Sequence, residues 1–94
     1  MTRELHVDAS QLENHAMKVI EVLGPGCSNC QKLEANAREA VAQAGVAAEI
    51  RHVTDYAEIA SRGVMSTPGL VIDGTVVSVG KVPTSWTIAA WLRE

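Results

Sequence analysis

Both cysteines of this chain lie in one short segment, Gly24 to Cys30, and only two residues separate them. An apolar run at residues 17–23 precedes the segment, and residues 28–44 follow it with apolar side chains every three or four positions. β-Branched residues that end at glycine and proline are typical of a strand, and the three-to-four spacing is typical of an amphipathic helix. The sequence therefore predicts a strand–turn–helix unit with two thiols at the start of the helix.

The two thiols should differ in reactivity. Cys27 is expected at the first helical position, where unpaired backbone N–H groups and the positive end of the helix dipole favour a thiolate. Cys30 continues an apolar stripe through Leu33 and Ala37, so we expect it to point inward. Such a helical pair has Cα atoms roughly 5–5.5 Å apart, within the ~4.4–6.8 Å that a disulfide needs. This pattern predicts that Cys27 attacks a substrate disulfide and that Cys30 resolves the mixed disulfide.

Length and composition indicate one globular domain, with 94 residues of which 47% are hydrophobic and 20% charged. A net charge of −3 and an aromatic content of 3% argue against a nucleic-acid partner, which basic and stacking side chains would bind. No stretch approaches the ~20 apolar residues of a membrane span, and residues 1–14 lack the apolar centre of a signal peptide. We therefore expect a cytoplasmic protein without a membrane partner, where a cysteine pair is more often redox-active or metal-binding than a permanent bridge.

The rest of the chain alternates short strands and helices. We expect strands at residues 17–23, 48–54, 69–72 and 75–79, and helices at 28–44, 55–62 and from 84 or 85 to 92. Asp73-Gly74 between the last two strands is a strong signal of an antiparallel hairpin, and the crossover helix between the first two makes them parallel. The predicted fold class is α/β, with the order β-α-β-α-β-β-α, a mixed four-stranded sheet and helices on both faces.

Residues 1–16 are expected to form a short extension, separate from a domain at residues 17–94. Leu5 and Val7 alternate with polar residues, as in a short edge strand, and Ser10 with Glu13 has the spacing of a helix capping box, which favours a helix at 11–16. His6 and His15 also lie in this extension. We interpret them as solvated side chains rather than metal ligands.

Glu21 interrupts the first predicted strand. Apolar residues occupy both parities of this strand, which indicates that both faces of it are covered. A carboxylate at such a position is costly unless it is paired or protonated.

Three segments of the chain resemble the thioredoxin superfamily, and most closely its small, glutaredoxin-sized, redox-active disulfide proteins. These segments are Gly24-Pro25-Gly26-Cys27-Ser28-Asn29-Cys30, residues 33–40 and residues 66–74. The resemblance extends from about Met17 to the C-terminus. It implies a thioredoxin-like fold and a thiol–disulfide oxidoreductase that transfers electrons between a disulfide substrate and a separate reductase.

The resemblance also implies roles for residues outside the cysteine pair. Pro68 would be the family's cis-proline, although a proline that opens a strand is by itself expected to be trans. The backbone of Thr67 would dock the substrate chain as a short strand. Glu21 lies six residues before Cys27, the spacing of a buried acid in thioredoxins proper. It would then relay the proton of the resolving thiol, which requires a raised pKa; otherwise Glu21 reaches water at a strand edge.

The motif departs from two branches of the superfamily. Thioredoxins proper carry tryptophan before the first cysteine and Gly-Pro between the two, where this chain has Gly26 and Ser28-Asn29. Glutaredoxins carry Pro-Tyr and a basic glutathione pocket, for which Lys32 and Lys81 are the candidate cations here. The motif therefore leaves the substrate, the reductase and the direction of electron flow open.

Two alternatives to an oxidoreductase remain. A Gly-x-Gly-Cys-x-x-Cys segment after a strand also occurs in ferredoxin-like domains that carry Cu(I) or Zn(II), but those domains end on a strand, and two thiolates are too few for a closed zinc site. A non-catalytic interaction domain would require both cysteines to fall at the reactive position by chance. For the oxidoreductase we expect no bound metal and no cofactor.

Overall fold

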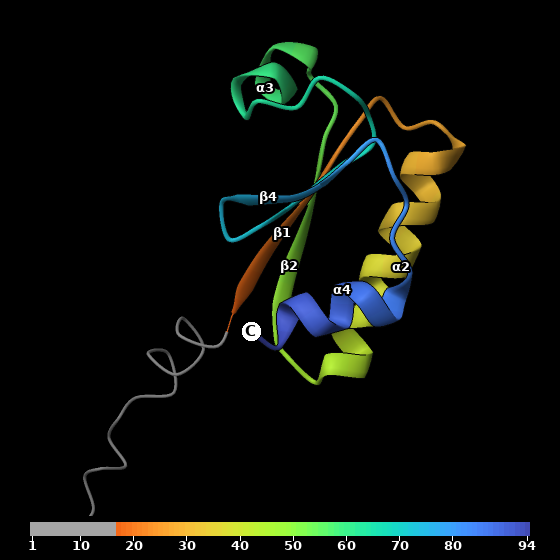
Figure 1. Ribbon diagram of the computed structural model, residues 1–94, viewed down its shortest axis with the longest axis vertical. Helices are drawn as coiled ribbons and strands as arrows, with labels where there is room; N and C mark the ends of the chain where they lie inside the picture. The colour runs from red at the N-terminus through yellow and green to blue at the C-terminus, as the bar shows by residue number, and fades with distance from the viewer. Residues whose placement is uncertain (1–16) are drawn as a thin grey trace, which may run out of the picture.

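The computed structural model describes residues 17–94 (Figure 1). The elements follow the predicted order: β1 (Lys18–Leu23), α2 (Ser28–Ala44), β2 (Ala48–Val53), α3 (Tyr56–Ser61), β3 (Gly69–Ile72), β4 (Thr75–Val79) and α4 (Ser85–Leu92). The strand and helix predicted within residues 1–16, together with His6 and His15, lie outside the described residues. None of the helices in residues 17–94 is long and apolar enough to cross a membrane.

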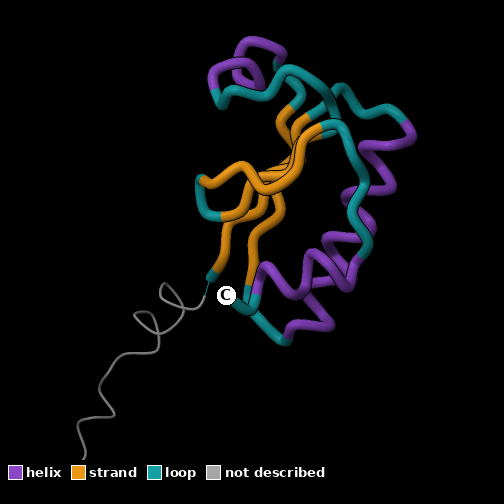
Figure 2. The backbone as a smooth tube through the Cα atoms, viewed as in Figure 1, coloured by secondary structure: helices purple, strands orange, loops and turns teal. Residues whose placement is uncertain are grey.

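The four strands form one mixed sheet with the order β2-β1-β3-β4. β1 pairs with β2 in parallel, while β3 is antiparallel to both of its neighbours, β1 and β4. Figure 2 shows the strands fanned in one twisted layer beside α2 and α4. This confirms the predicted α/β fold and places the central strand β1 directly before the cysteine segment.

Local signals account for the element ends. Gly45 ends α2 in a left-handed conformation, with φ 69°, and its N–H donates to Val41 O at 3.0 Å. The side chains of Asp55 and Thr84 cap α3 and α4 by accepting backbone N–H groups of their first turns. Because these signals act within a few residues, the sequence specifies the boundaries closely.

Two hydrophobic cores cover the two faces of the sheet. The larger core lies between the sheet, α2 and α4, and consists of Ile20, Val22, Leu33, Ala37, Ala40, Leu70, Ile72, Ile88, Ala89 and Leu92. The smaller core lies under α3 and consists of Leu23, Ile59, Val64 and Val71. Adjacent residues of β1 and β3 thus enter different cores, as alternation along a strand requires.

Candidate active site

The cysteine segment turns the chain from β1 into α2. Cys27 is the N-cap residue of α2, with an extended backbone, and Gly26 before it has a φ of 93°. Cys30 lies in the first turn of α2 and is fully buried, whereas Cys27 is exposed. The two Sγ atoms are 3.2 Å apart. The structure therefore brings together an exposed and a buried thiol at one helix end.

The surroundings shift the pKa values of the two thiols in opposite directions. The backbone N–H of Cys30 contributes most to lowering the pKa of Cys27, followed by the thiol of Cys30 and the N–H of Asn29. Burial contributes most to raising the pKa of Cys30, followed by its hydrogen bond with Cys27. Because these N–H groups have no partner within the helix, they favour a negative charge on the thiol at the N-cap. Cys27 is thus the more readily ionised thiol of the pair.

The loop before β3 lies beside this pair. The Thr67–Pro68 peptide bond is cis, and Pro68 is buried. A Cβ atom placed on Gly24 would lie 3.6 Å from the Cβ atoms of both Cys30 and Thr67. The N–H of Gly80 donates to Pro68 O at 2.8 Å and ties the loop after β4 to the same place. Thr67 and Pro68 are therefore next to the dithiol, although 40 residues of chain or so intervene.

Glu21 is not placed as a proton relay requires. Its carboxylate accepts two hydrogen bonds from Arg62, at 2.8 and 2.9 Å, and the residue is 8% exposed. The hydrogen bonds from Arg62 lower the pKa of Glu21 by more than burial raises it. The relay prediction required a raised pKa and is wrong in this respect, because the carboxylate is paired rather than protonated. The sequence did not identify Arg62 as the partner of Glu21, because a buried acid indicates that a cation must pair with it but not which cation.

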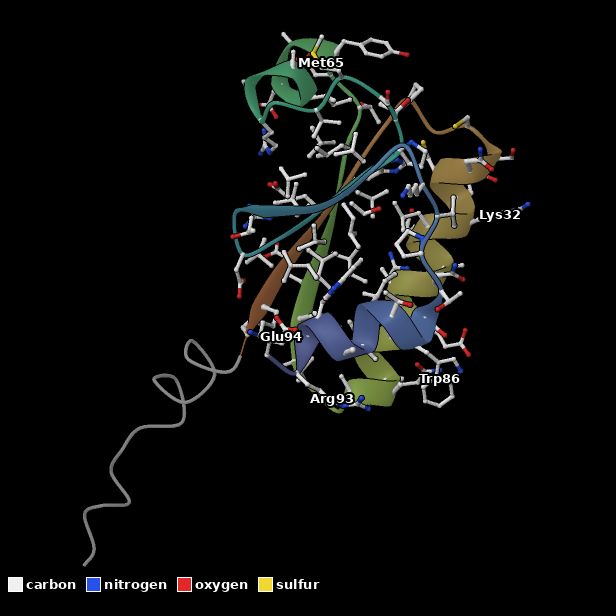
Figure 3. The ribbon with its side chains drawn as sticks, viewed as in Figure 1. Lys32, Met65, Trp86, Arg93 and Glu94 are labelled. Atoms are coloured by element: carbon white, nitrogen blue, oxygen red, sulfur yellow. The ribbon has the colours of Figure 1, made fainter. Side chains whose placement is uncertain are left out.

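The candidate cations for a glutathione pocket, Lys32 and Lys81, are both exposed. Figure 3 shows the side chain of Lys32 directed away from the body of the protein. Lys81 lines a cavity of about 540 Å³ between β4 and α4, together with Val77, Val82 and Trp91, and neither cysteine borders it. Within residues 17–94, no three His, Cys, Asp or Glu side chains are grouped as metal ligands. The structure thus does not bring these lysines to the dithiol.

Two exposed apolar side chains lie near the end of the sheet where α2 begins, and the sequence did not indicate a function for either of them. Met65 is 88% exposed and precedes Thr67 by two residues, and Tyr56 at the start of α3 is 65% exposed. Figure 3 shows Met65 beside the helix that Figure 1 labels α3, at the end of the sheet where α2 begins. A single apolar residue at the start of a helix or before a loop does not indicate from the sequence whether it is buried, so only the fold reveals the exposure of these two side chains.

Comparison with known proteins assigns the family. The model of the thioredoxin domain matches residues 18–93. This chain belongs to the thioredoxin family. A thioredoxin of Methanothermobacter thermautotrophicus is 42% identical over 66 residues, which cover 70% of this chain and 86% of the relative. A thioredoxin of Methanocaldococcus jannaschii is 43% identical over 78 residues, which cover 83% of this chain and 90% of the relative.

Membership in the thioredoxin family confirms the resemblance and the predicted fold, and assigns the chain to a family of thiol–disulfide oxidoreductases. The ferredoxin-like alternative predicted the order β-α-β-β-α-β. The order in residues 17–94 differs in three places, because α3 lies between β2 and β3, no helix lies between β3 and β4, and the last element is the helix α4. The topology of residues 17–94 is therefore that of the predicted thioredoxin-like fold and not that of a ferredoxin-like domain.

Proposed function

We propose that this protein reduces disulfides with Cys27 as the attacking thiol and Cys30 as the resolving thiol. The observation that carries the proposal is the pair of sulfurs 3.2 Å apart with opposite exposure. An exposed thiol with a lowered pKa ionises readily and can reach a substrate. A buried thiol with a raised pKa stays protonated beside it until the mixed disulfide has formed.

In the first step, the Cys27 thiolate attacks one sulfur of a substrate disulfide, forms a mixed disulfide and expels the other substrate sulfur as a thiolate. The mixed disulfide removes the negative charge at Cys27, which is one of the causes that raise the pKa of Cys30. Cys30 then loses its proton to the departing thiolate or to water and attacks Cys27 Sγ, which releases the second substrate thiolate. Two electrons pass to the substrate, and the chain gains one Cys27–Cys30 disulfide.

Protein disulfides are the proposed substrates, docked along Thr67 and Pro68. The backbone of Thr67, beside the cis peptide bond, would pair with an extended substrate segment as a short added strand. Exposed Met65 and Tyr56 supply apolar surface near this segment for a protein partner. A separate reductase would restore the dithiol, in a reducing compartment such as the cytoplasm. Residues 17–94 would form the functional domain, and residues 1–16 an extension to it.

The pH profile of alkylation tests the roles of the two thiols. In a Cys30→Ser variant, the reaction of Cys27 with iodoacetamide should show a pKa below the usual ~8.5 of a cysteine. The matched Cys27→Ser variant should leave a thiol that reacts slowly, with a pKa above that value. A pKa of Cys27 near ~8.5, together with no turnover by the parent protein, would contradict the proposal.

Turnover is measured as the dithiol-driven reduction of a protein disulfide, with metal content determined on the same sample. Cys27→Ser should abolish turnover, and Cys30→Ser should accumulate a mixed disulfide that is visible by mass. Stoichiometric Cu(I) or Zn(II) without redox cycling would instead favour metal carriage.

A further inference from the structure

Gly24 lies between the central strand and the cysteine segment and is buried. Its N–H donates to Val53 O at 2.9 Å and extends the pairing of β1 with β2 by one residue. The glycines with positive φ are Gly26, Gly45, Gly63, Gly74 and Gly80. Gly24 is not one of them, and a residue that precedes proline, as Gly24 precedes Pro25, favours an extended backbone that any amino acid can adopt. Backbone conformation therefore does not explain the glycine.

The sulfur of Cys30 does explain it. A Cβ atom on Gly24 would lie 2.3 Å from Cys30 Sγ, far inside van der Waals contact, and the same Cβ would be 3.6 Å from Thr67 Cβ. By contrast, a Cβ atom on Gly26 would meet nothing within 4 Å. Cys30 Sγ thus occupies the space that a side chain at position 24 would take.

We propose that Gly24 is a positioning residue for the resolving thiol. By lacking a side chain, it lets Cys30 Sγ lie against the end of β1, 3.2 Å from Cys27 Sγ and next to Thr67. The inference rests on the proposed function, because it assigns Gly24 to the second step, in which Cys30 attacks the mixed disulfide. The first step depends mainly on the exposed Cys27 and on the backbone N–H groups of α2, which Gly24 does not contact in the described interactions, and less on the thiol of Cys30.

Gly24→Ala should therefore separate the two steps. The added methyl group forces Cys30 Sγ to move, and a misplacement of about 1 Å in a reacting group lowers the rate by up to ~100-fold. We expect resolution to slow by ~10- to 100-fold and attack by Cys27 to slow less, because the backbone N–H of Cys30, which contributes most to lowering the pKa of Cys27, stays in place when the thiol of Cys30 moves. A mixed disulfide should then accumulate during turnover. Rapid acid quenching followed by mass spectrometry measures the two steps on one sample.

Gly69→Ala is the matched control. Gly69 is the other described glycine without a positive φ, and its added Cβ would lie 3.0 Å from Val64 Cγ1, in the smaller core and away from the sulfur. This variant should lose stability without accumulating the mixed disulfide. Accumulation in both variants to the same extent would show a general packing effect and would overturn the proposal.

Removing the sulfur provides a second test that does not depend on catalysis. If the sulfur is what excludes a side chain at position 24, Gly24→Ala should cost stability in the parent protein and much less in a Cys30→Ala background. Denaturant unfolding of the reduced proteins measures this double-mutant cycle. An equal cost in both backgrounds would overturn the inference, and so would failure of both the single and the double variant to fold.

The outcomes also separate this inference from the proposed function. A parent protein without turnover would contradict the proposed function, while the stability cycle would still support or overturn the contact between Gly24 and Cys30. Normal turnover by the parent with a parental resolution rate in folded Gly24→Ala would contradict the positioning role alone.

Discussion

The two faces of the sheet are built differently. The larger core is covered by two helices, α2 and α4, whereas the smaller core lies under the six-residue helix α3 and is bordered by the ion pair between Glu21 and Arg62. Figure 1 shows α2 and α4 together along one side of the sheet and α3 at one end. The dithiol begins a helix of the first face, and the loop with the proposed docking residues Thr67 and Pro68 adjoins the second.

The dithiol lies at the start of α2, the helix that covers the larger core. Cys30 is the first of the fully buried residues of α2, and it continues into Leu33, Ala37 and Ala40 along the same face of the helix. Close packing on this face fixes the position of the helix end and therefore of both sulfurs. The face with the larger core thus positions the two sulfurs, whose separation matters for the proposed reaction.

The loop that contains Thr67 and Pro68, the proposed docking residues, adjoins the smaller core. Val64, three residues before Thr67, packs in this core. A Cβ atom on Gly69 would lie 3.0 Å from Val64 Cγ1. The ion pair of Arg62 with Glu21 joins the end of α3 to β1. Fewer apolar contacts and a charged pair allow this face to open locally at lower cost than the larger core. We infer that the proposed docking loop is the more adjustable part of the candidate site.

Leu33→Ala should have the largest effect on stability. Leu33 is fully buried in the larger core, and removal of a buried leucine side chain costs about 2–5 kcal/mol, against a total stability of ~5–15 kcal/mol for a domain. Urea unfolding of the reduced protein measures the change. Val76→Ala, at a residue that is 37% exposed, is the control and should change the free energy of unfolding by less than about 0.5 kcal/mol.

Ile59→Ala should cost less than Leu33→Ala, near about 2 kcal/mol, because the thinner core can collapse around the smaller side chain. Ile59 is 2% exposed. The loop with the proposed docking residues Thr67 and Pro68 begins at Val64, which packs with Ile59 in this core. We therefore also expect KM for a protein disulfide to rise while kcat changes little. A larger loss of stability than in Leu33→Ala, or a fall in kcat at constant KM, would break the comparison of the two faces.

Glu21→Gln should weaken the smaller face in a pH-dependent way. Arg62 lowers the pKa of Glu21 in the folded state, so the stability that the charged carboxylate contributes is present above its unfolded pKa of ~4.3 and is lost as the pH falls through the lower folded pKa. Parent and variant should therefore differ most near neutral pH and converge in acid. A difference that is constant with pH would show that the ion pair does not stabilise this face.

Arg38→Gln should have the smallest effect. Arg38 donates to Glu34 at 2.7 Å on the outer side of α2, with 63% of its side chain exposed. An exposed pair of this spacing contributes about 0.3–0.5 kcal/mol, and salt screens it. A change above ~1 kcal/mol would contradict the distinction between this pair and the partly buried pair of Glu21.

The sequence was sufficient wherever a local signal decided the structure. Gly45 ended α2 at the predicted residue, and Asp73-Gly74 turned the chain between β3 and β4 with both residues at positive φ. The inward direction of Cys30 also followed from the helical stripe that it begins. These features depend on interactions between residues a few positions apart.

Contacts between distant residues could not be predicted in the same way. Glu21 and Arg62 are 41 residues apart, and the pattern of the sequence does not choose among the eight lysines and arginines of the chain. Gly24 was predicted only as the end of a strand, because its approach to Cys30 Sγ depends on how α2 packs against the sheet. The order of the strands, with β1 between β2 and β3, likewise follows from tertiary packing.

Gly26, directly before the attacking thiol, has a φ of 93° and open space around an added Cβ. Room is thus available on this flank of Cys27, but an L-amino acid cannot use it without backbone strain. A D-amino acid has the mirror-image preference and adopts a positive φ readily. At position 26, chirality rather than size therefore limits which residue fits beside the thiol. Chemical synthesis could place a D-residue with a side chain there, which ribosomal substitution cannot do without strain.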